Sequence, residues 1–535
     1  LLLISVLSLK LIKGDNIVPL WPLPTEYSLG SKSIYLSKDF NFILSTEQKK
    51  SDELTFIIDK YTKIVNSVDN SDIIRIDISL LENCYINISD LSSNLSIESD
   101  ESYDLSITSA NVCNINAQTI WGVNRALETF TQLLVKSLDE KFIVCNYIPV
   151  DISDSPRFKH RGLLIDTSRH YLPISTIKRV IDSLPDNKLN VLHWHIVDAQ
   201  SFPLILPNYP RIINSAYSPS LTYLPNDLSD VYLYAKRRGV RVVFEFDIPG
   251  HTGCLWHSVP DVMANCVQKY SYNINDFALD PTNEITFDFV YEVLQVLRQI
   301  DEDSVSNVYI HVGGDEVVYG CWREDDRITS YMSTNNISSY DSLLASFVER
   351  VDDMIVSLNA TPIHWEEVFY TGASVPSGTI YQVWDSFQPN AENKPISQST
   401  KKKSIKSSDE SILQTIVSAN YQVIASPSDY WYLNYLSTSW KTMYSYNPTD
   451  GLTDQQADLV LGGEAAVWGE YVDETNIMST IYPRLFAVSE RLWSDSSVTS
   501  TDDALNRLLI QRCRLLQRGF DVAPVQPGYC DTNYV

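Results

Sequence analysis

The sequence predicts an α/β protein in which a (β/α)8 barrel, the TIM-barrel fold, follows a smaller α+β domain. From about residue 157 the chain alternates between buried-strand and helix patterns, and eight strand candidates occur over roughly 340 residues. Nearly all of these strands end close to an acidic, basic or aromatic residue. Barrel proteins build their sites at the carboxyl ends of the strands, so we expect the functional residues there.

The N-terminus carries an apolar run, LLLISVLSL, which is followed by small and polar residues near Gly14. A run of this length is typical of a signal peptide. We therefore expect residues 1–14 to be a signal peptide remnant, with a leading β-strand or a trimmed helix as the alternative. No later stretch approaches the roughly 18 apolar residues that a membrane-spanning helix needs, so the sequence predicts no membrane span.

Residues 15–152 mix two apolar periodicities. The segments SDELTFIIDKYTKIV and TIWGVNRALETFTQLL repeat apolar residues at helical spacing, whereas IIRIDISLL and SYDLSITS alternate as strands do. No group of residues in this region resembles a catalytic site. The pattern predicts a separate, non-catalytic α+β domain.

The predicted barrel covers residues 157–500 and begins after the linker SDSPRF. Its strand candidates are residues 162–166, 191–197, 242–246, 308–312, 362–365, 380–384, 423–426 and 459–463. The segment 386–410 contains KKKSIKSSDES, and its polar, low-complexity composition predicts a disordered surface loop. Residues 501–535 predict a final amphipathic helix that packs on the barrel and a tail that follows it.

Composition and charge narrow the classes of partner. The chain has 41 basic and 67 acidic residues, and its net charge of −26 argues against binding to nucleic acid or to an anionic membrane. Eight cysteines and a secretory start favour some disulfides. Four N-x-S/T triplets are candidate glycosylation sites, at Asn87, Asn94, Asn336 and Asn359.

The stretch on which the prediction of function rests is NVYIHVGGDEVVYGCW, residues 307–322. A buried-strand pattern runs into two glycines, and Asp315 and Glu316 follow at once. Two neighbouring carboxylates in a partly buried site cannot both ionise freely, so one pKa rises and that group can donate a proton, as glycoside hydrolysis requires. The alternative is a solvated Asp-Glu turn, which the glycine pair and the downstream aromatic residues disfavour.

The motif HVGGDEVVYGCW resembles the catalytic signature of the family 20 glycoside hydrolases, the β-N-acetylhexosaminidases, and especially their lysosomal eukaryotic branch. The resemblance covers residues 21–530 and includes RGLLIDTSRHYLP, NVLHWHIVDAQSFP, FEFDIPGHT and LGGEAAVWGEYVD. It implies an exo-acting, retaining enzyme that removes terminal β-linked GlcNAc or GalNAc from glycoconjugates, without metal or organic cofactor. It also implies a lysosomal or secreted protein and, because the family is often dimeric, a homodimer.

The resemblance assigns a role to each matching residue. Enzymes of this family use the substrate's own 2-acetamido oxygen to attack C1. Glu316 is then the acid and base, and Asp315 orients the acetamido group and stabilises the oxazolinium charge. The residues that match the family's substrate-binding positions are Arg169, Asp198, His251, Trp365, Trp384, Tyr432, Asn434, Trp468 and Glu470.

Other features follow from the same resemblance. The family pairs Cys266 with Cys321 and Cys513 with Cys530, while Cys84, Cys113, Cys145 and Cys254 have no clear counterparts. Two positions depart from the family pattern. Ala199 stands where many relatives carry a second acid, and Asn434 stands where relatives often have Asp, which bears on specificity.

Two alternatives come from other classes of protein. His193 and His195 place two imidazoles on one face of a strand, with His251, His311 and His364 near other strands, so a metal-dependent barrel hydrolase is one alternative. A non-catalytic sugar-binding barrel is the other, and the intact Asp-Glu pair disfavours it. The natural substrate and the preference between GlcNAc and GalNAc stay open.

Overall fold

The computed structural model describes residues 18–45, 51–66, 80–92, 94–137, 142–265, 277–300, 308–385, 411–530 and 534. Three of the predicted features lie outside these residues: the signal peptide remnant at 1–14, Cys266 with its pairing to Cys321, and the polar segment 386–410. No helix within the described residues is long and apolar enough to cross a membrane.

The N-terminal part is a mixed sheet of six strands, with the order β1-β2-β4-β3-β6-β5. The strands are β1 (Glu26–Leu44), β2 (Leu80–Asp90), β3 (Tyr103–Ile107), β4 (Cys113–Thr119), β5 (Leu134–Lys136) and β6 (Ile143–Asp154). Helices α1 (Asp52–Val65) and α2 (Ile120–Gln132) pack on the sheet, and both begin where the sequence predicts a helix. Ser51 and Thr119 cap them, because each side chain accepts hydrogen bonds from backbone N–H groups of the first turn.

Two disulfides are present among the described residues. Cys84 and Cys113 are register partners on β2 and β4 and are joined by a disulfide, which the sequence alone could not assign. The second disulfide joins Cys513 to Cys530 and ties the C-terminal tail to its helix. Cys145 and Cys254 are buried free thiols.

The second part of the chain is a closed barrel of eight parallel strands, as predicted. The strands are β7 (His160–Asp166), β8 (Val191–His195), β9 (Arg241–Glu245), β10 (Val308–His311), β11 (Ala360–Trp365), β12 (Ile380–Val383), β13 (Gln422–Ala425) and β14 (Val460–Val467). Each overlaps one of the strand candidates read from the sequence. All of them are largely buried, which explains why they read as continuous apolar runs rather than as alternating patterns.

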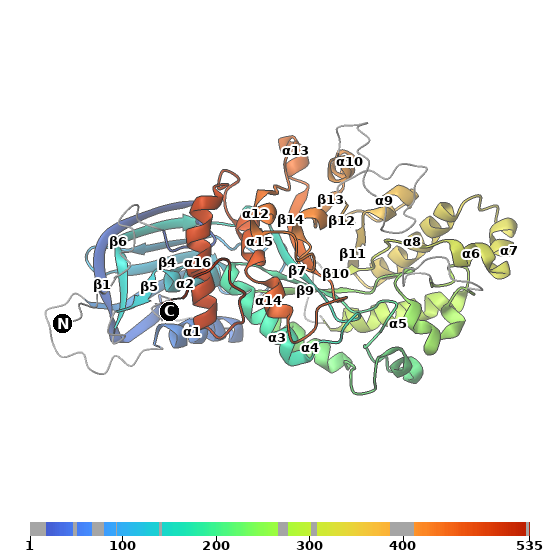
Figure 1. The fold of residues 1–535 in the computed structure, drawn as a ribbon, viewed down its shortest axis with the longest axis horizontal. Helices are drawn as coiled ribbons and strands as arrows, with labels where there is room; N and C mark the ends of the chain where they lie inside the picture. Colours follow the sequence, from blue (N-terminus) through green and yellow to red (C-terminus); the bar gives the residue numbers. More distant parts are fainter. Residues whose placement is uncertain are drawn as a thin grey trace, which may run out of the picture.

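Helices connect and cover the strands (Figure 1). In chain order they are α3 (Ile174–Ser183), α4 (Pro225–Lys236), α5 (Glu284–Gln299), α6 (Gly320–Glu324), α7 (Asp326–Thr334), α8 (Tyr340–Ser357), α9 (Glu367–Thr371), α10 (Ile412–Ser418), α11 (Ser428–Trp431), α12 (Trp440–Ser445), α13 (Asp454–Ala457), α14 (Ile477–Ile481), α15 (Arg484–Trp493) and α16 (Thr501–Gln517). Figure 1 shows α16 standing between the sheet of β1–β6 and the barrel.

The N-terminal sheet domain covers the amino ends of the barrel strands. Glu101 accepts hydrogen bonds at 2.6 Å from Arg125 of α2 and at 2.6 Å from Arg161 of β7, and all three side chains are buried. Arg125 also donates to the carbonyls of Leu189 and Gly239, which lie just before β8 and β9. The carboxyl ends of the strands therefore lie at the end of the barrel opposite to this domain.

Candidate active site

The loop after β10 carries the two adjacent carboxylates. Gly313 and Gly314 both have positive φ, and a Cβ on Gly313 would lie 1.6 Å from the Asp247 carboxylate. Only glycine fits so close an approach in this conformation. The Gly314 N–H donates to Asp247 Oδ1 at 3.0 Å. The glycine pair thus turns the chain over the end of β9 and brings Asp315 and Glu316 to the carboxyl ends of the strands.

Asp315 and Glu316 have different surroundings. Asp315 is 8% exposed, and its Oδ1 is buried with no hydrogen-bond partner among the described residues. The side chain of Glu316 is 30% exposed, and its backbone has φ of 49°, a conformation that costs free energy for a residue with a side chain. The two carboxylates are equivalent in sequence, but one is enclosed and the other reaches the opening of the site.

The environment of Glu316 favours its protonated form. Burial raises the pKa of the Glu316 carboxyl; the nearby His251 opposes this and the charge of Asp315 adds to it. His251 Nε2 lies 3.6 Å from Glu316 Oε2 and 3.6 Å from Asp315 Oδ2, so one imidazole faces both carboxylates. A carboxyl that holds its proton above its ordinary pKa is suited to act as a general acid.

Asp198 connects His251 to a buried arginine. His251 Nδ1 lies 2.9 Å from Asp198 Oδ2, and Arg169 Nη2 lies 2.7 Å from the same oxygen. Arg169 also pairs with Asp166 at 3.1 Å, and its guanidinium lies 5.0 Å from the ring centroid of Trp468. Its Nε has no hydrogen-bond partner among the described residues. The predicted residues Arg169, Asp198 and His251 are therefore one contiguous group beside Glu316.

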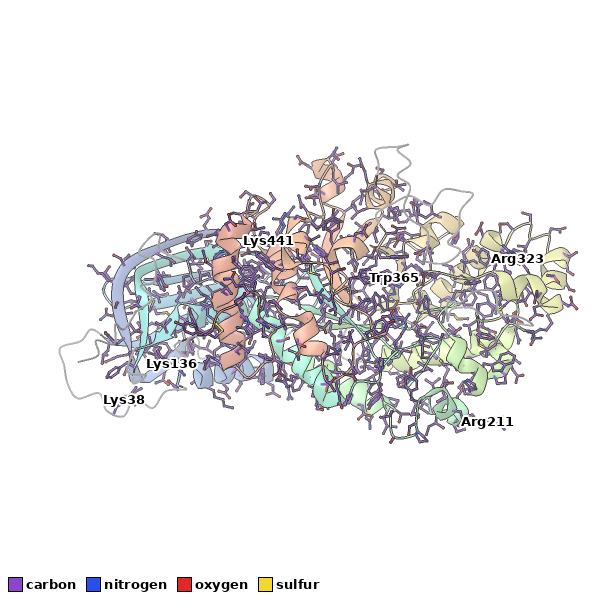
Figure 2. The ribbon with its side chains drawn as sticks, viewed as in Figure 1. Lys38, Lys136, Arg211, Arg323, Trp365 and Lys441 are labelled. Carbon is purple, nitrogen blue, oxygen red and sulfur yellow. A yellow bond between two sulfur atoms is a disulfide. The ribbon has the colours of Figure 1, made fainter. Side chains whose placement is uncertain are left out.

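Four aromatic side chains line the other side of the site. Trp365, labelled in Figure 2, ends β11 and forms an apolar cluster with Tyr432 and, at its edge, Trp384 and Trp468. Its ring centroid lies 6.2 Å from that of Trp468, and Tyr432 lies 6.1 Å from Trp468. The indole N–H of Trp365 donates to Glu245 at 2.8 Å, which fixes the ring. Such a cluster offers an apolar wall with few competing polar groups.

Two carboxylates that the sequence analysis overlooked hold Trp384. The indole N–H of Trp384 lies 3.2 Å from both oxygens of Glu367, and the Trp384 backbone N–H donates to Glu366 at 3.0 Å. Burial raises the pKa of Glu367, and the charges of Glu366 and Asp315 add to the shift. The available signal was the sequence HWEEV, in which both acids directly follow Trp365.

Asn434 and Glu470 lie on the loops after β13 and β14. Burial raises the pKa of Tyr435, and the charges of Glu470 and Glu316 raise it further. Asn434 Oδ1 is buried and has no hydrogen-bond partner among the described residues. The charge of Arg169 acts on Glu470 and lowers its pKa against a larger effect of burial. All nine predicted binding residues therefore lie at the carboxyl ends of the barrel strands.

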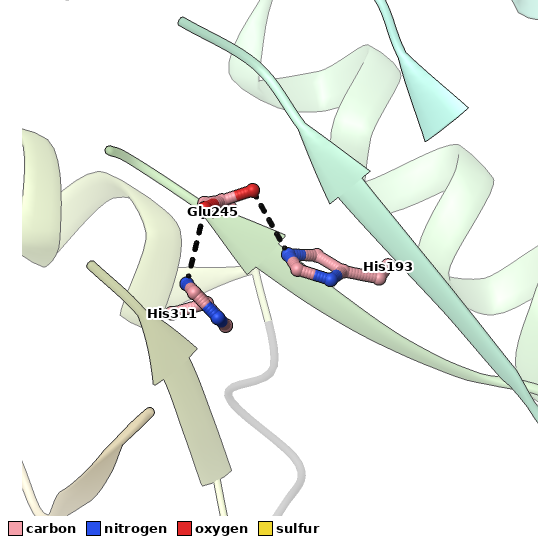
Figure 3. A group of neighbouring side chains, drawn as sticks. All are labelled: His193, Glu245 and His311. Carbon is pink, nitrogen blue, oxygen red and sulfur yellow. Dashed lines mark ion pairs between the residues drawn. The ribbon is translucent and has the colours of Figure 1, made fainter. Parts of the chain in front are cut away.

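Buried histidines and acids offer three groups with metal-binding spacing within the described part of the chain: His193, Glu245 and His311 (Figure 3); His195, Glu245 and Asp247; and Asp247, His251 and Asp315. Glu245 already accepts hydrogen bonds from Trp365 and His195, and Asp247 accepts one from Gly314. The His311 Nδ1 lone pair accepts the Gly313 N–H at 3.1 Å. In the two groups that contain Glu245, most candidate ligand atoms are therefore already engaged in hydrogen bonds, which fits a polar network better than a metal site; in the third group Asp315 Oδ1 has no such partner among the described residues.

A closed barrel that carries an enclosed carboxylate, a neighbouring carboxyl with a raised pKa and an aromatic wall at its strand ends has the parts of a glycoside hydrolase. The family model described as "Glycosyl hydrolase family 20, catalytic domain" matches residues 158–496, and the one described as "beta-acetyl hexosaminidase like" matches residues 20–133. The chain belongs to glycosyl hydrolase family 20. The resemblance read from its motifs is thereby confirmed, and the chain is an enzyme of the β-hexosaminidase class.

Named relatives agree with this family. The chain is 32% identical over 527 residues to β-hexosaminidase subunit B1 of Dictyostelium discoideum, covering 95% of this chain and 89% of the relative. It is 38% identical over 441 residues to the human β-hexosaminidase subunit beta, covering 81% and 74%. Among solved structures, a chitobiase from Flavobacterium johnsoniae superposes with a TM-score of 0.79 at 26% identity, covering 94% of this chain and 73% of that one.

Proposed function

We propose that the enzyme is an exo-acting, retaining β-N-acetylhexosaminidase that removes terminal β-linked GlcNAc or GalNAc with the help of the substrate's acetamido group. The observation that carries this proposal is the state of Asp315. A buried carboxylate oxygen without a hydrogen-bond partner is costly unless a ligand supplies the donor. The N–H of a 2-acetamido group is such a donor, and the aromatic wall beside Asp315 suits the acetamide methyl group.

The reaction then proceeds in two steps. Glu316 gives its proton to the glycosidic oxygen, the acetamido oxygen attacks C1, and the bond from C1 to the leaving oxygen breaks. Asp315 accepts the acetamido N–H and stabilises the positive charge of the oxazolinium ring. In the second step the Glu316 carboxylate takes a proton from water, which attacks C1 and reopens the ring. Two displacements at C1 retain the β configuration.

The other residues hold the sugar and the acid. Tyr432 donates its hydroxyl proton to the amide carbonyl, and Trp365, Trp384 and Trp468 enclose the acetamide and the apolar face of the sugar. Arg169 and Glu470 hydrogen-bond the outer hydroxyls. Asp198 and His251 orient Glu316, since His251 lies between the Asp198 carboxylate and the two reacting carboxyl groups.

The stereochemistry of the first-formed product tests this proposal. Hydrolysis of a β-linked GlcNAc substrate, followed by proton NMR in the first minutes, is expected to release the β hemiacetal before it mutarotates. Release of the α hemiacetal would mean a single displacement by water and would exclude an acetamido intermediate.

The activity should have a bell-shaped dependence on pH with an acidic optimum. Because the pKa of Glu316 is raised, the protonated acid persists above its ordinary range, and activity is lost as the pH rises through that raised value. The acid limb arises because the oxazolinium ring needs a carboxylate charge beside it. The measurement is kcat against pH with an aryl GlcNAc substrate, and a level plateau through pH 8 would contradict the assignment of Glu316.

Asn434 is expected to govern tolerance of a 6-sulfate. A carboxylate at this position would repel the sulfate, and two like charges about 4 Å apart cost roughly 4 kcal/mol near a protein surface. The amide removes that repulsion without adding attraction. We expect secondary but measurable turnover of 6-sulfated GlcNAc, and Asn434→Asp should lower the sulfated-to-neutral ratio of kcat/KM about tenfold or more, equal to roughly 1.4 kcal/mol. An unchanged ratio would place the 6-position elsewhere.

Location and assembly are part of the proposal. Disulfides form in oxidising compartments, and the Cys84–Cys113 and Cys513–Cys530 bridges indicate passage through the secretory pathway. We propose a lysosomal or secreted glycoprotein, because all four candidate acceptors, Asn87, Asn94, Asn336 and Asn359, are exposed. We also propose a homodimer, for which light scattering of the purified chain is the test.

A further inference from the structure

A chain of buried imidazoles and carboxylates continues from Asp198 into the barrel, away from the substrate. His195 Nε2 lies 3.2 Å from Asp198 Oδ2, and its Nδ1 lies 2.6 Å from Glu245 Oε2. All three side chains have no exposed surface. His195 is one of the histidines that suggested a metal-dependent barrel hydrolase, but in the fold it bridges two carboxylates.

Glu245, the last residue of β9, is the centre of this chain. Figure 3 shows His193 and His311 on either side of it; His193 Nε2 lies 3.1 Å and His311 Nδ1 lies 3.2 Å from its oxygens. The Trp365 indole N–H donates to Glu245 Oε1 at 2.8 Å, whereas His195 faces Oε2. One carboxylate thus contacts both the chain that leads to the acid and the aromatic wall expected to hold the acetamide.

The chain ends at a second buried acid. His193 Nδ1 lies 2.7 Å from Glu464 of β14, and His160 Nε2 lies 2.9 Å from the same carboxylate. Carboxylates and imidazoles therefore alternate from Glu464 through His193, Glu245, His195 and Asp198 to His251.

Hydrogen-bond geometry determines the charge of His195. An imidazole whose two nitrogens both face carboxylate oxygens at hydrogen-bond distance must donate from both, and only the imidazolium can do so. Burial lowers the pKa of His195, but the charge of Glu245 and the hydrogen bonds with Asp198 and Glu245 outweigh it and raise the pKa to about 10. His311 differs, because its Nδ1 accepts the Gly313 N–H and burial lowers its pKa.

We propose that Glu245 is a positioning residue for the reaction. It keeps His195 as an imidazolium, and this cation, with Arg169, holds the Asp198 carboxylate in the place from which it orients His251 against Glu316. The same carboxylate holds the Trp365 indole, so the acid and the acetamide pocket share one buried anchor. The proposal rests on the role proposed above for Glu316.

The groups that face Glu245 and His195 come from several strands, and His195 Nδ1 lies 2.6 Å from Glu245 Oε2. The titratable and charged groups around Glu245 and His195 are Asp166 from β7, His193 from β8, Asp198 after β8, Asp247 after β9, His311 from β10 and, through His193, Glu464 from β14. The titratable and charged groups that interact electrostatically with Glu316 are His251, Asp315, Arg169, Asp198 and Tyr435.

The decisive variant is Glu245→Gln, which keeps the shape and one acceptor oxygen but removes the charge. Without its counter-ion, buried His195 loses its proton, and the Asp198 carboxylate, whose charge raises the pKa of Glu316, loses the cation beside it. Glu316 should then hold its proton to a higher pH, so the alkaline limb of kcat moves up. We expect kcat to fall about tenfold or more with KM changed less than about twofold, the usual scale for groups that orient a functional side chain.

Asp352→Asn is the matched control. Asp352 is a buried carboxylate of α8 that lies 3.0 Å from His364 Nε2, so it is also half of a buried histidine–acid pair, but it contacts no member of the chain that leads to Asp198. The Asp352→Asn variant should have the same kcat and the same alkaline limb of the pH profile as the wild type. A Glu245→Gln enzyme that folds and shows wild-type kcat and limb would overturn the proposal, as would an equal kinetic loss in Asp352→Asn.

A direct measurement reports the protonation of His195 in the wild-type enzyme and does not depend on activity. The protein has eight histidines, and nitrogen-15 NMR of their imidazoles reports whether each ring nitrogen carries a proton. At pH 8, both nitrogens of His195, assigned with His195→Asn, should be protonated in the wild type. One bare nitrogen at that pH would refute the role of Glu245 even if Glu316 proves to be the acid. Conversely, a doubly protonated His195 beside an active Glu316→Gln enzyme would refute only the role of Glu316.

Discussion

Replacement of Glu316 by Gln should lower kcat by about 10²-fold or more, the usual range for loss of a general acid. The amide keeps the volume and the hydrogen-bonding capacity but cannot give a proton to the leaving oxygen. The loss should depend on the leaving group. It should be largest for a sugar or an alkyl alcohol, which needs the proton, and smaller for a nitrophenol, which departs as an anion.

The control for this variant is Glu474→Gln, which changes an exposed acid on the loop after β14. It should behave as the wild type with every leaving group. Equal losses for alcohol and nitrophenol substrates in Glu316→Gln would show that Glu316 does not protonate the leaving oxygen.

Replacement of Asp315 by Asn should also lower kcat by about 10²-fold or more, because a neutral amide cannot stabilise the positive oxazolinium ring. This loss has a different signature. It should be nearly independent of the leaving group, since Asp315 acts on the acetamide and not on the departing oxygen.

A double cycle isolates the contact between Asp315 and the substrate. The wild type and Asp315→Asn are compared on paired substrates that carry either a 2-acetamido or a 2-hydroxyl group. If Asp315 acts through the acetamido N–H, the variant loses little activity on the 2-hydroxyl substrate. The effects of changing the enzyme and of changing the substrate are then far from additive. Equal losses on both substrates would mean that Asp315 supports the site in another way.

The fold could be predicted because the barrel strands are short, buried on both faces and separated by helical patterns. The predicted strands differ from those of the structure mainly at their ends. The last candidate, residues 459–463, is longer in the structure, since β14 runs from Val460 to Val467 and pairs with β7 to close the barrel. The candidate at 191–197 is shorter, because β8 ends at His195. Barrel closure is a long-range interaction that local patterns do not reveal.

The position of the candidate site residues at the strand ends could be predicted for a similar reason. Asp315, Glu316 and the tryptophans follow their strands directly, and a charged or aromatic residue at such a position is conspicuous in the sequence. Glu245 and His195 are the last residues of β9 and β8, Glu464 lies within β14, and all three side chains are fully buried. They come together only because residues far apart in the chain point into one barrel, so no local motif marks them as a group.

The most direct test of the account is a comparison of kcat/KM for aryl β-glycosides that differ only at C2. The substrate's own acetamide is the proposed nucleophile, so aryl β-GlcNAc and β-GalNAc should be hydrolysed readily and aryl β-glucoside and β-galactoside hardly at all. If the enzyme cleaves plain β-glucosides as fast as the acetamido sugars, the acetamide does not attack C1 and the account is wrong.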